Sequence, residues 1–130
     1  MKNKFFPNLA SPITINGVTF KNRILGAPMS NPELDPDCHM RKEFHENRAR
    51  GGMASVAIGL GIVDPDGRTH TKEAKLYDVM SLPSLKEVTN AIHRHNCRAV
   101  MELAHGGKYA GARSHGDPHI PTVYGPNNEI

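Results

Sequence analysis

The stretch from Met53 to Val63 consists almost entirely of small and apolar residues, and it constrains the fold more than any other part of the chain. A strand with one solvated face alternates apolar and polar residues, and this stretch does not alternate. A continuous apolar run of this length is typical of a strand covered on both faces, as in parallel sheets. We therefore predict a parallel sheet with this strand in its interior.

Two further strands are predicted beside it. Residues 23–27 form a short apolar run that Pro28 ends, and residues 98–103 form another. The chain opens with a hairpin, because Asn-Gly at positions 16 and 17 separates two short β-prone runs. An Asn-Gly pair favours a type I′ turn, which needs a positive φ at both central residues.

Two helices connect these strands. Residues 40–50 contain good helix formers before a Gly-Gly stop. A clearer helix starts near Pro83, which suits a first turn, and ends before Asn96, which can take the left-handed conformation. The apolar face of the first helix is thin and consists mainly of Met40, Phe44 and Ala49.

The order of these elements predicts an α/β fold. Residues 64–67 form a turn after the central strand, and residues 68–80 are predicted to be irregular. The order is hairpin, β, α, β, α, β, and helical crossovers between strands indicate a parallel sheet. Both a doubly wound sheet and a (β/α)8 barrel fit this order. No linker or repeat divides the 130 residues, so we expect one domain.

The composition argues against several classes of function. The formal net charge is +3, with bases scattered among acids, so a nucleic-acid partner is not expected. No run of about 18 apolar residues occurs, and the N-terminus lacks the apolar stretch of a secretory signal, so no membrane partner is expected. Cys38 and Cys97 lie far apart and outside any CxxC pair. We expect free thiols in a cytoplasmic protein.

Candidate functional residues lie where the strands end. In either architecture, function gathers at the carboxyl ends of the strands. Residues 27–30, 58–61 and 101–108 leave those ends here. Glu102 is the informative residue, because an unpaired carboxylate inside an apolar strand is costly. It either turns outward to a Lys or Arg, or faces a site and accepts hydrogen bonds.

Other chemistries find little support. The eight histidines match no zinc spacing, so no metal site is predicted. No GxSxG elbow is present for a serine hydrolase. Gly59 and Gly61 lack the third glycine and the following helix of a phosphate loop. Small residues at these positions let the backbone approach a ligand or a neighbouring strand closely.

Taken together and in order, the three strand ends resemble the old yellow enzyme family of FMN-dependent reductases. The family opens with a segment that ends K-N-R-I-x-x-A-P-M, matched here by residues 21–29. A D-P-x-G-R turn of one subgroup is matched by residues 64–68. The family's third strand ends Q-L-x-H-x-G-R, and residues 102–108 resemble it, with Glu102 in place of Gln and Lys108 in place of Arg. The earlier places of the opening segment are held by Leu9, Pro12 and Ile15, and the closing G-P of the family by Gly125 and Pro126.

The resemblance implies the N-terminal portion of a (β/α)8 TIM barrel, with three βα units and a hairpin that caps the barrel's bottom. Residues 1–130 would be the N-terminal part of a single FMN-binding barrel domain. A barrel needs about 250 residues, so the chain would be incomplete as a catalyst. The family's catalytic residues, phosphate-binding loops and any iron–sulfur ligands would come from beyond Ile130.

The resemblance also implies which residues contact FMN. Ser30 would lie near flavin C4=O and N5, where a donor tunes the potential of the ring. Glu102 would replace the glutamine at the pyrimidine edge, and an ionised Glu can only accept hydrogen bonds, whereas Gln also donates. The full set of implied contacts is Ala27, Pro28, Met29, Ser30, Gly59, Leu60 and Glu102.

The implied activity is the transfer of hydride from NAD(P)H to FMN, and from flavin N5 to the β-carbon of an activated alkene. Enones, enoates and dienoyl thioesters are the substrate classes, and a homo-oligomer stays open for the full-length form. Two alternatives remain at this point. One is a non-catalytic remnant or the scaffold half of a split flavoprotein, and the other is a small doubly wound binding domain without flavin.

Overall fold

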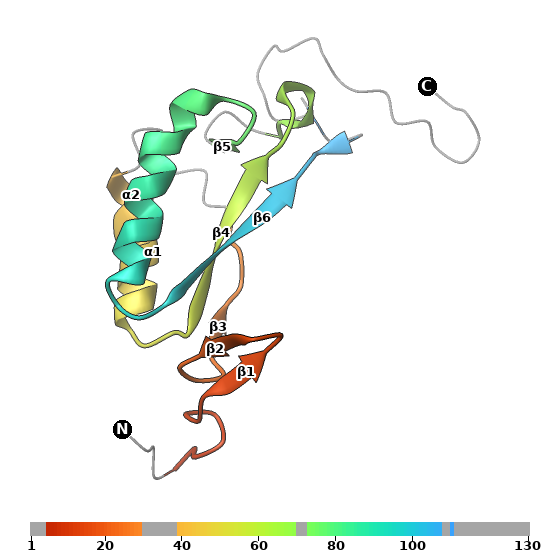
Figure 1. The fold of residues 1–130 in the computed structure, drawn as a ribbon. Helices are drawn as coiled ribbons and strands as arrows, with labels where there is room; N and C mark the ends of the chain where they lie inside the picture. The colour runs from red at the N-terminus through yellow and green to blue at the C-terminus, as the bar shows by residue number, and fades with distance from the viewer. Residues whose placement is uncertain (1–4, 30–38, 70–72, 108–109, 111–130) are drawn as a thin grey trace, which may run out of the picture.

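The computed structural model describes residues 5–29, 39–69, 73–107 and 110 (Figure 1). A two-stranded sheet precedes a four-stranded sheet that is covered by two helices. The strands are β1 (Ile13–Ile15), β2 (Val18–Phe20), β3 (Leu25–Gly26), β4 (Ser55–Ile62), β5 (Ala74–Lys75) and β6 (Arg98–Ala104). The helices are α1 (His39–Arg50) and α2 (Leu82–His93), and short 3₁₀ turns lie at Pro65–Gly67 and Val79–Ser81.

The opening hairpin is confirmed. Strands β1 and β2 pair antiparallel, and Asn16 and Gly17 have φ values of 45° and 79°. Both central residues are therefore left-handed, as a type I′ turn requires. The hairpin lies beyond the N-terminal ends of β4 and β6 (Figure 1). The segments before and after the hairpin are joined, because the N–H of Arg23 donates to the carbonyl of Leu9 at 3.0 Å.

The predicted parallel sheet is confirmed as well. Strand β4 pairs in parallel with β3 on one side and β6 on the other. The predicted irregular stretch, residues 68–80, was wrong in one respect, because it contains β5. This short strand pairs in parallel with Gly61 and Ile62 at the C-terminal end of β4. A two-residue strand carries no periodic pattern, so only the neighbouring strand defines it.

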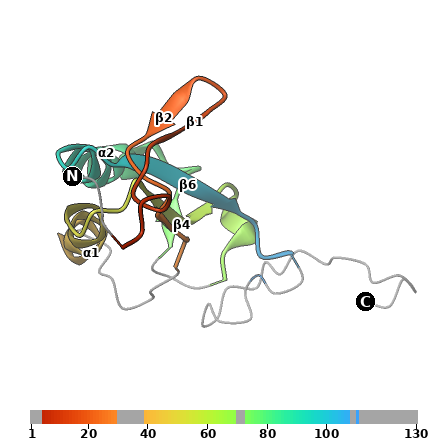
Figure 2. The ribbon, with the colours of Figure 1, turned by 90° about the horizontal axis from the view of Figure 1, so that it is seen from below.

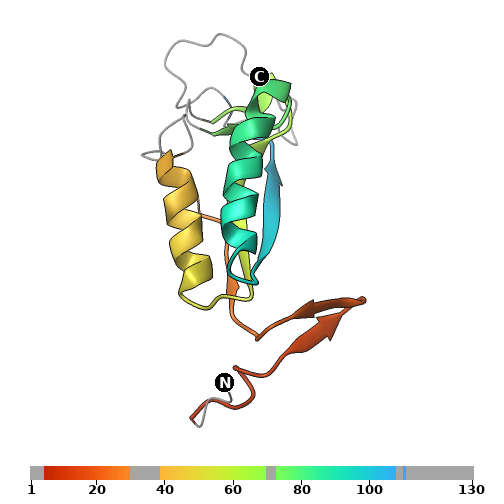
Figure 3. The same ribbon diagram turned by 60° about the vertical axis from the view of Figure 1, so that its left-hand side comes forward.

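Both helices pack on the same side of the sheet (Figures 2 and 3). Val56 and Ile58 of β4 are at most 1% exposed and pack against Val88 and Ile92 of α2. Ala49 of α1 completes this core, together with Cys97, whose buried thiol has a raised pKa because burial disfavours the thiolate. Cys38 lies outside the described residues. On the sheet face away from the helices, Leu25 and Val100 remain about half exposed.

Helix α1 turns a polar stripe toward the core. Its buried residues are Arg41, His45 and Ala49, which are four positions apart and therefore share one face. The predicted apolar face was wrong at Met40, which is 50% exposed. The pattern of apolar residues did not reveal the buried face of α1, because two of its buried residues, Arg41 and His45, are polar. Within the described part of the chain, neither helix has the length and apolar character that a membrane crossing requires.

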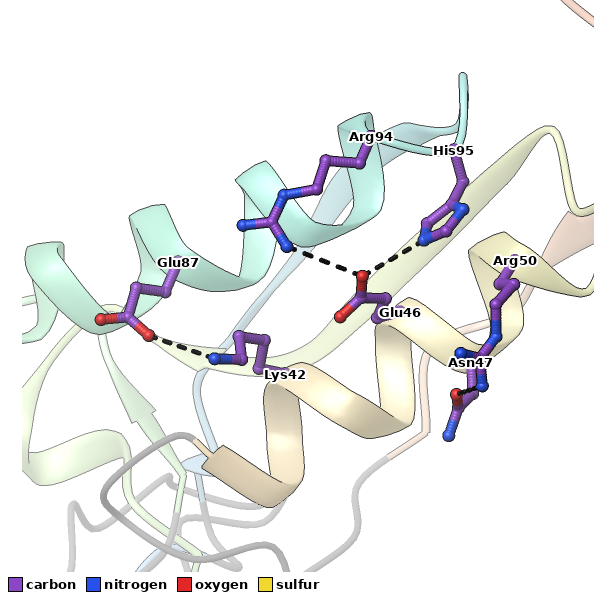
Figure 4. A network of polar contacts seen from close by, with 7 residues as sticks. All are labelled: Lys42, Glu46, Asn47, Arg50, Glu87, Arg94 and His95. Carbon is purple, nitrogen blue, oxygen red and sulfur yellow. Dashed lines mark hydrogen bonds and ion pairs between the residues drawn. The ribbon is translucent and has the colours of Figure 1, made fainter.

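The two helices are joined by polar contacts along their exposed side (Figure 4). Lys42 Nζ lies 3.6 Å from a carboxylate oxygen of Glu87. Glu46 Oε1 lies 3.2 Å from His95 Nε2 and 3.7 Å from a guanidinium nitrogen of Arg94. These partners are partly solvated, and exposed ion pairs stabilise a fold by only about 0–1 kcal/mol each.

Side chains at the entrance to β3 hold the N-terminal end of the large sheet together. Lys21 Nζ donates to the carbonyl of His95 at 2.7 Å, in the turn between α2 and β6. Asn22 Nδ2 donates to the carbonyl of Gly52 at 2.8 Å, after the end of α1. Asn22 Oδ1 accepts from the N–H of Ile24. The Lys-Asn pair thus satisfies carbonyls in the turns that follow the two helices.

Candidate functional site

The C-terminal ends of β3, β4 and β6 meet at Gly59. A Cβ atom placed on Gly59 would lie 2.6 Å from Oε2 of Glu102, 3.0 Å from Cβ of Pro28 and 3.5 Å from the backbone nitrogen of Met29. Any side chain at this position would therefore displace its neighbours. Glycine here lets neighbouring strands approach closely, which is the interpretation that the sequence offered beside a phosphate loop.

A bulge in β4 produces this arrangement. The register pairs Ile58 with Met101 and then Gly61 with Leu103, so Gly59 and Leu60 together lie opposite Glu102. Two residues facing one define a β-bulge, and bulges redirect side chains near functional sites. The peptide between Gly59 and Leu60 is cis. Three predicted site residues, Gly59, Leu60 and Glu102, thus lie at one irregularity.

The Glu102 side chain lies on the face of the sheet away from the helices. Its neighbour Met101 packs against the helical core, and alternate residues of a strand point to opposite faces. The carboxylate is partly buried against Gly59 and Pro28. Among the described residues, no Lys or Arg forms an ion pair with it. Within the described part of the chain, the alternative in which Glu102 turns outward to a Lys or Arg is therefore not seen.

The remaining predicted residues fall into two groups. Ala27, Pro28 and Met29 follow β3 and are exposed, with Met29 51% exposed. Ser30 lies outside the described residues. Pro28, Met29 and Glu102 come together at the strand ends, where all three lie against Gly59.

Arg48 was missed by the sequence reasoning. From α1, its guanidinium reaches the end of β3, with one nitrogen 3.4 Å from the carbonyl oxygen of Ala27 and another 3.1 Å from Sδ of Met29. The same group lies 4.9 Å from the ring centroid of Phe44, one turn earlier. The i, i+4 spacing of Phe44 and Arg48 was the available signal.

A buried carboxylate at the same end of the sheet was also missed. Glu73, 7% exposed, accepts hydrogen bonds from the backbone N–H of Thr69 at 3.1 Å and from its hydroxyl. The contact joins Thr69, after the 3₁₀ turn at residues 65–67, to Glu73, the residue before β5. A Thr and a Glu four apart in a polar stretch give no sequence signal of such a contact.

His105 lies just past β6 and is exposed. Its ring packs over Gly67, where an added Cβ would lie 2.6 Å from the ring carbon Cδ2. The N–H of Gly107 donates to His105 Nδ1 at 3.0 Å, so the neutral ring carries its proton on Nε2. The contact joins the D-P-x-G-R turn to the third strand end, which places His105 as a structural residue beside the site.

The sheet is parallel, both helices cover one side of it, and its strand ends converge. This arrangement is that of the N-terminal part of a (β/α)8 barrel. The family model for the NADH:flavin oxidoreductase / NADH oxidase family matches residues 8–129. The chain belongs to this family, which includes the old yellow enzymes. Both the resemblance and the barrel fold inferred from it are thus confirmed.

Individual relatives agree with this assignment. The chain is similar to an NADPH dehydrogenase from Halalkalibacterium halodurans, with 31% identity over 114 residues, which cover 85% of the chain and 32% of that protein. A 2-naphthoyl-CoA reductase structure matches with a TM-score of 0.75 and 26% identity, covering 82% of the chain and 17% of its own. The old yellow enzyme from Trypanosoma cruzi shares the fold, with a TM-score of 0.69, 21% identity and coverages of 82% and 29%. The chain spans about a third of the curated relative's length.

Proposed function

We propose that this chain supplies the first part of the FMN site of an oxidoreductase that carries hydride from NAD(P)H to an activated alkene. Residues 1–130 would form the N-terminal part of a single barrel domain. The NADPH dehydrogenase relative supports a nicotinamide donor. The 2-naphthoyl-CoA reductase neighbour supports an unsaturated thioester among the candidate substrates.

The convergence of three strand ends at Gly59 is the observation that supports the proposal most. At Gly59 the Cβ of Pro28 and the carboxylate of Glu102 occupy the space that a side chain would need, because an added Cβ would lie within 3.0 Å of both. The strand ends therefore meet more closely than any residue but glycine allows. We propose that the edge of this close-packed junction is where an isoalloxazine ring would lie.

Each residue has a proposed role at this surface. Ala27, Pro28 and Met29 present backbone to the ring, and Ser30 supplies a hydroxyl donor near C4=O and N5. Gly59 and Leu60 give close backbone contact. A donor or dipole fixed against the ring changes its reduction potential, and tuning of that kind is what a protein contributes to flavin chemistry.

Glu102 is a proposed flavin contact at which this chain departs from the family's glutamine. Where the family carries Gln, a carboxylate here lies against Gly59 without an ion pair among the described residues. It can accept a hydrogen bond from the N3–H of the ring and cannot donate one to C2=O. We propose that Glu102 makes the bound flavin harder to reduce than Gln would.

Bound FMN would supply the hydride chemistry, accepting hydride from NAD(P)H and passing it to the alkene. The described residues bind and orient the ring. The groups that orient substrate and donate a proton belong to the rest of the barrel, so these 130 residues alone are expected to be inactive. An iron–sulfur cluster, if the full protein carries one, would be held there too.

The test is to purify the full-length protein, release its flavin by denaturation and identify the flavin by chromatography. We expect FMN, anaerobic bleaching of its visible absorption by NADPH or NADH, and recovery of that absorption on addition of an enone or enoyl thioester. A protein that neither retains nor rebinds FMN would contradict the proposal.

A further inference from the structure

The side chain of Arg48 extends from helix α1 to the C-terminal end of β3, which the proposed flavin would contact. Its guanidinium contacts two atoms of the segment Ala27–Met29, the carbonyl oxygen of Ala27 and Sδ of Met29. The side chain is partly buried, and the ring of Phe44 lies against the guanidinium. Neither of the two contacted atoms takes part in the pairing of β3, which involves only Leu25 and Gly26.

The two contacts hold Met29 in one orientation. The backbone nitrogen of Met29 lies 3.5 Å from the place that a Cβ on Gly59 would take, while its sulfur lies 3.1 Å from a guanidinium nitrogen of Arg48 on helix α1. The methionine side chain is therefore drawn away from the surface formed by Pro28 and Gly59. Methionine has three rotatable side-chain bonds, so without a partner its thioether would sample several positions.

The chemistry of the contact suits this function. A guanidinium presents several N–H donors in a fixed plane, and it can therefore reach a carbonyl and a thioether at once. The distance of 3.4 Å to Ala27 is long for a hydrogen bond, so the nearer contact to sulfur is the one that orients the segment. A lysine would keep the charge and lose this two-pronged geometry.

We propose that Arg48 is a positioning residue that sets the conformation of the Pro28–Met29 peptide and so shapes the flavin surface from behind. This inference rests on the proposed function for its consequence, flavin affinity. The contact itself can be tested without flavin. The two parts can therefore fail separately.

The first measurement is made on the flavin-free full-length protein labelled with ¹³C at its methionine methyl groups. The Met29 signal is assigned by its loss in Met29→Leu. In Arg48→Gln, we expect this signal to move and to narrow as the side chain becomes mobile. The matched control is Arg50→Gln, because Arg50 lies on the same helix, is exposed and donates to Asn47 instead. The control should leave the Met29 signal in place.

The second measurement is FMN affinity. We expect Arg48→Gln to weaken FMN binding by about tenfold, the effect of losing one charge-assisted contact. Arg48→Lys should recover only part of it, and Arg50→Gln should bind like the wild type. Combined with Met29→Leu, Arg48→Gln should weaken binding by less than the product of the two single effects, since both changes break one contact.

The outcomes separate the two ideas. An unchanged Met29 signal in Arg48→Gln would overturn the positioning function, whatever flavin does. Equal FMN affinity in Arg48→Gln and Arg50→Gln would overturn it too, even if Arg48→Gln lowers the melting temperature, because that pattern describes a purely structural arginine. A wild-type protein that binds no FMN would instead refute the proposed function and leave the Met29 result standing.

Discussion

The two ends of the parallel sheet are built in opposite ways. At the N-terminal end, polar side chains form hydrogen bonds to the backbone. Lys21 donates to the carbonyl of His95, and Asn22 donates to that of Gly52. At the C-terminal end, the strands meet through small residues and a bulge at Gly59. There, Glu102 keeps a carboxylate that forms no ion pair among the described residues.

The difference shows that the two family motifs on either side of β3 have different functions. The Lys-Asn pair enters β3 and ties turns together, whereas Ala27-Pro28-Met29 leaves β3 and contributes to the surface at Gly59. In barrel folds, the N-terminal face generally serves stability and the C-terminal face function. Substitutions at one end should therefore change unfolding, and substitutions at the other should change ligand binding.

Gly59→Ala should have the largest effect on flavin binding, and it should act at the C-terminal end of the sheet only. Its Cβ would press on Glu102 and Pro28, and the strand end must move to accept it. We expect FMN affinity to fall by about a hundredfold, or roughly 2.7 kcal/mol, with a smaller change in the urea midpoint. Isothermal titration with FMN measures the first quantity. Wild-type affinity in this variant would mean that the Gly59 surface does not contact the flavin.

His45, on the buried face of α1, should make the stability of the protein depend on pH. Burial lowers its pKa from 6.5 to about 4, with smaller contributions from the charges of Arg48 and Arg41, and neither ring nitrogen has a hydrogen-bond partner among the described residues. The unfolded chain therefore takes up this proton before the folded one does. Stability should be complete above about pH 6.5 and decline by up to about 3 kcal/mol as the pH falls toward 4.

Urea unfolding of wild type and His45→Leu at several pH values between 4 and 7 isolates this contribution, because the other titrating groups are common to both. The difference between the two free energies of unfolding should change across this range and flatten above it. Parallel pH curves for the two proteins would show that His45 is solvated or bonded in solution.

Asn22→Ala should act on the other end. The variant loses a donor to Gly52 and an acceptor for the N–H of Ile24. One of these hydrogen bonds is part-buried and the other exposed, and at up to about 1 kcal/mol each they give a loss of about 1–2 kcal/mol in the free energy of unfolding. FMN affinity should stay within about twofold, a difference below 0.5 kcal/mol. A large loss of FMN affinity at unchanged stability would break the division between the two ends.

Glu46→Gln should have the smallest effect. Glu46 contacts His95 and Arg94 on the outer side of the helices, and all three side chains are partly solvated. We expect a loss of about 0.5 kcal/mol or less, smaller still in 0.5 M salt. A loss above about 1.5 kcal/mol, outside the range of exposed pairs, would mean that the Glu46 contacts shown in Figure 4 stabilise the fold more than exposed ion pairs do.

The elements predicted from the sequence were those with a periodic or turn signal. The hairpin around Asn16-Gly17, the buried strand β4 and the helix beginning near Pro83 each follow from local chemistry. Strand β5 carries no such signal, because its two residues are strand only through their pairing with β4. The buried face of α1 was predicted only in part, since Ala49 is buried as expected, whereas Met40 is exposed and the polar residues Arg41 and His45 are buried.

The site was predicted as a set of residues and not as a geometry. Strand ends pointed to Pro28, Gly59 and Glu102 one at a time, and the parallel order put them at the same edge. The bulge that sets two residues against Glu102 depends on the register between β4 and β6, which no local pattern encodes. The reach of Arg48 to Met29 depends likewise on how α1 packs, a tertiary fact.

The central claim is that Glu102 faces a bound flavin, and the flavin midpoint potential tests it most directly. A negative charge about 4 Å from the reduced ring would oppose reduction by on the order of 4 kcal/mol at an effective dielectric of 20, before any compensation. Even a third of that corresponds to about 30 mV for a two-electron couple. Spectroelectrochemical titration of the full-length wild type and Glu102→Gln should give a higher midpoint, by roughly 30 mV or more, in the Gln variant. An equal or lower midpoint in Glu102→Gln would mean that Glu102 does not face the flavin.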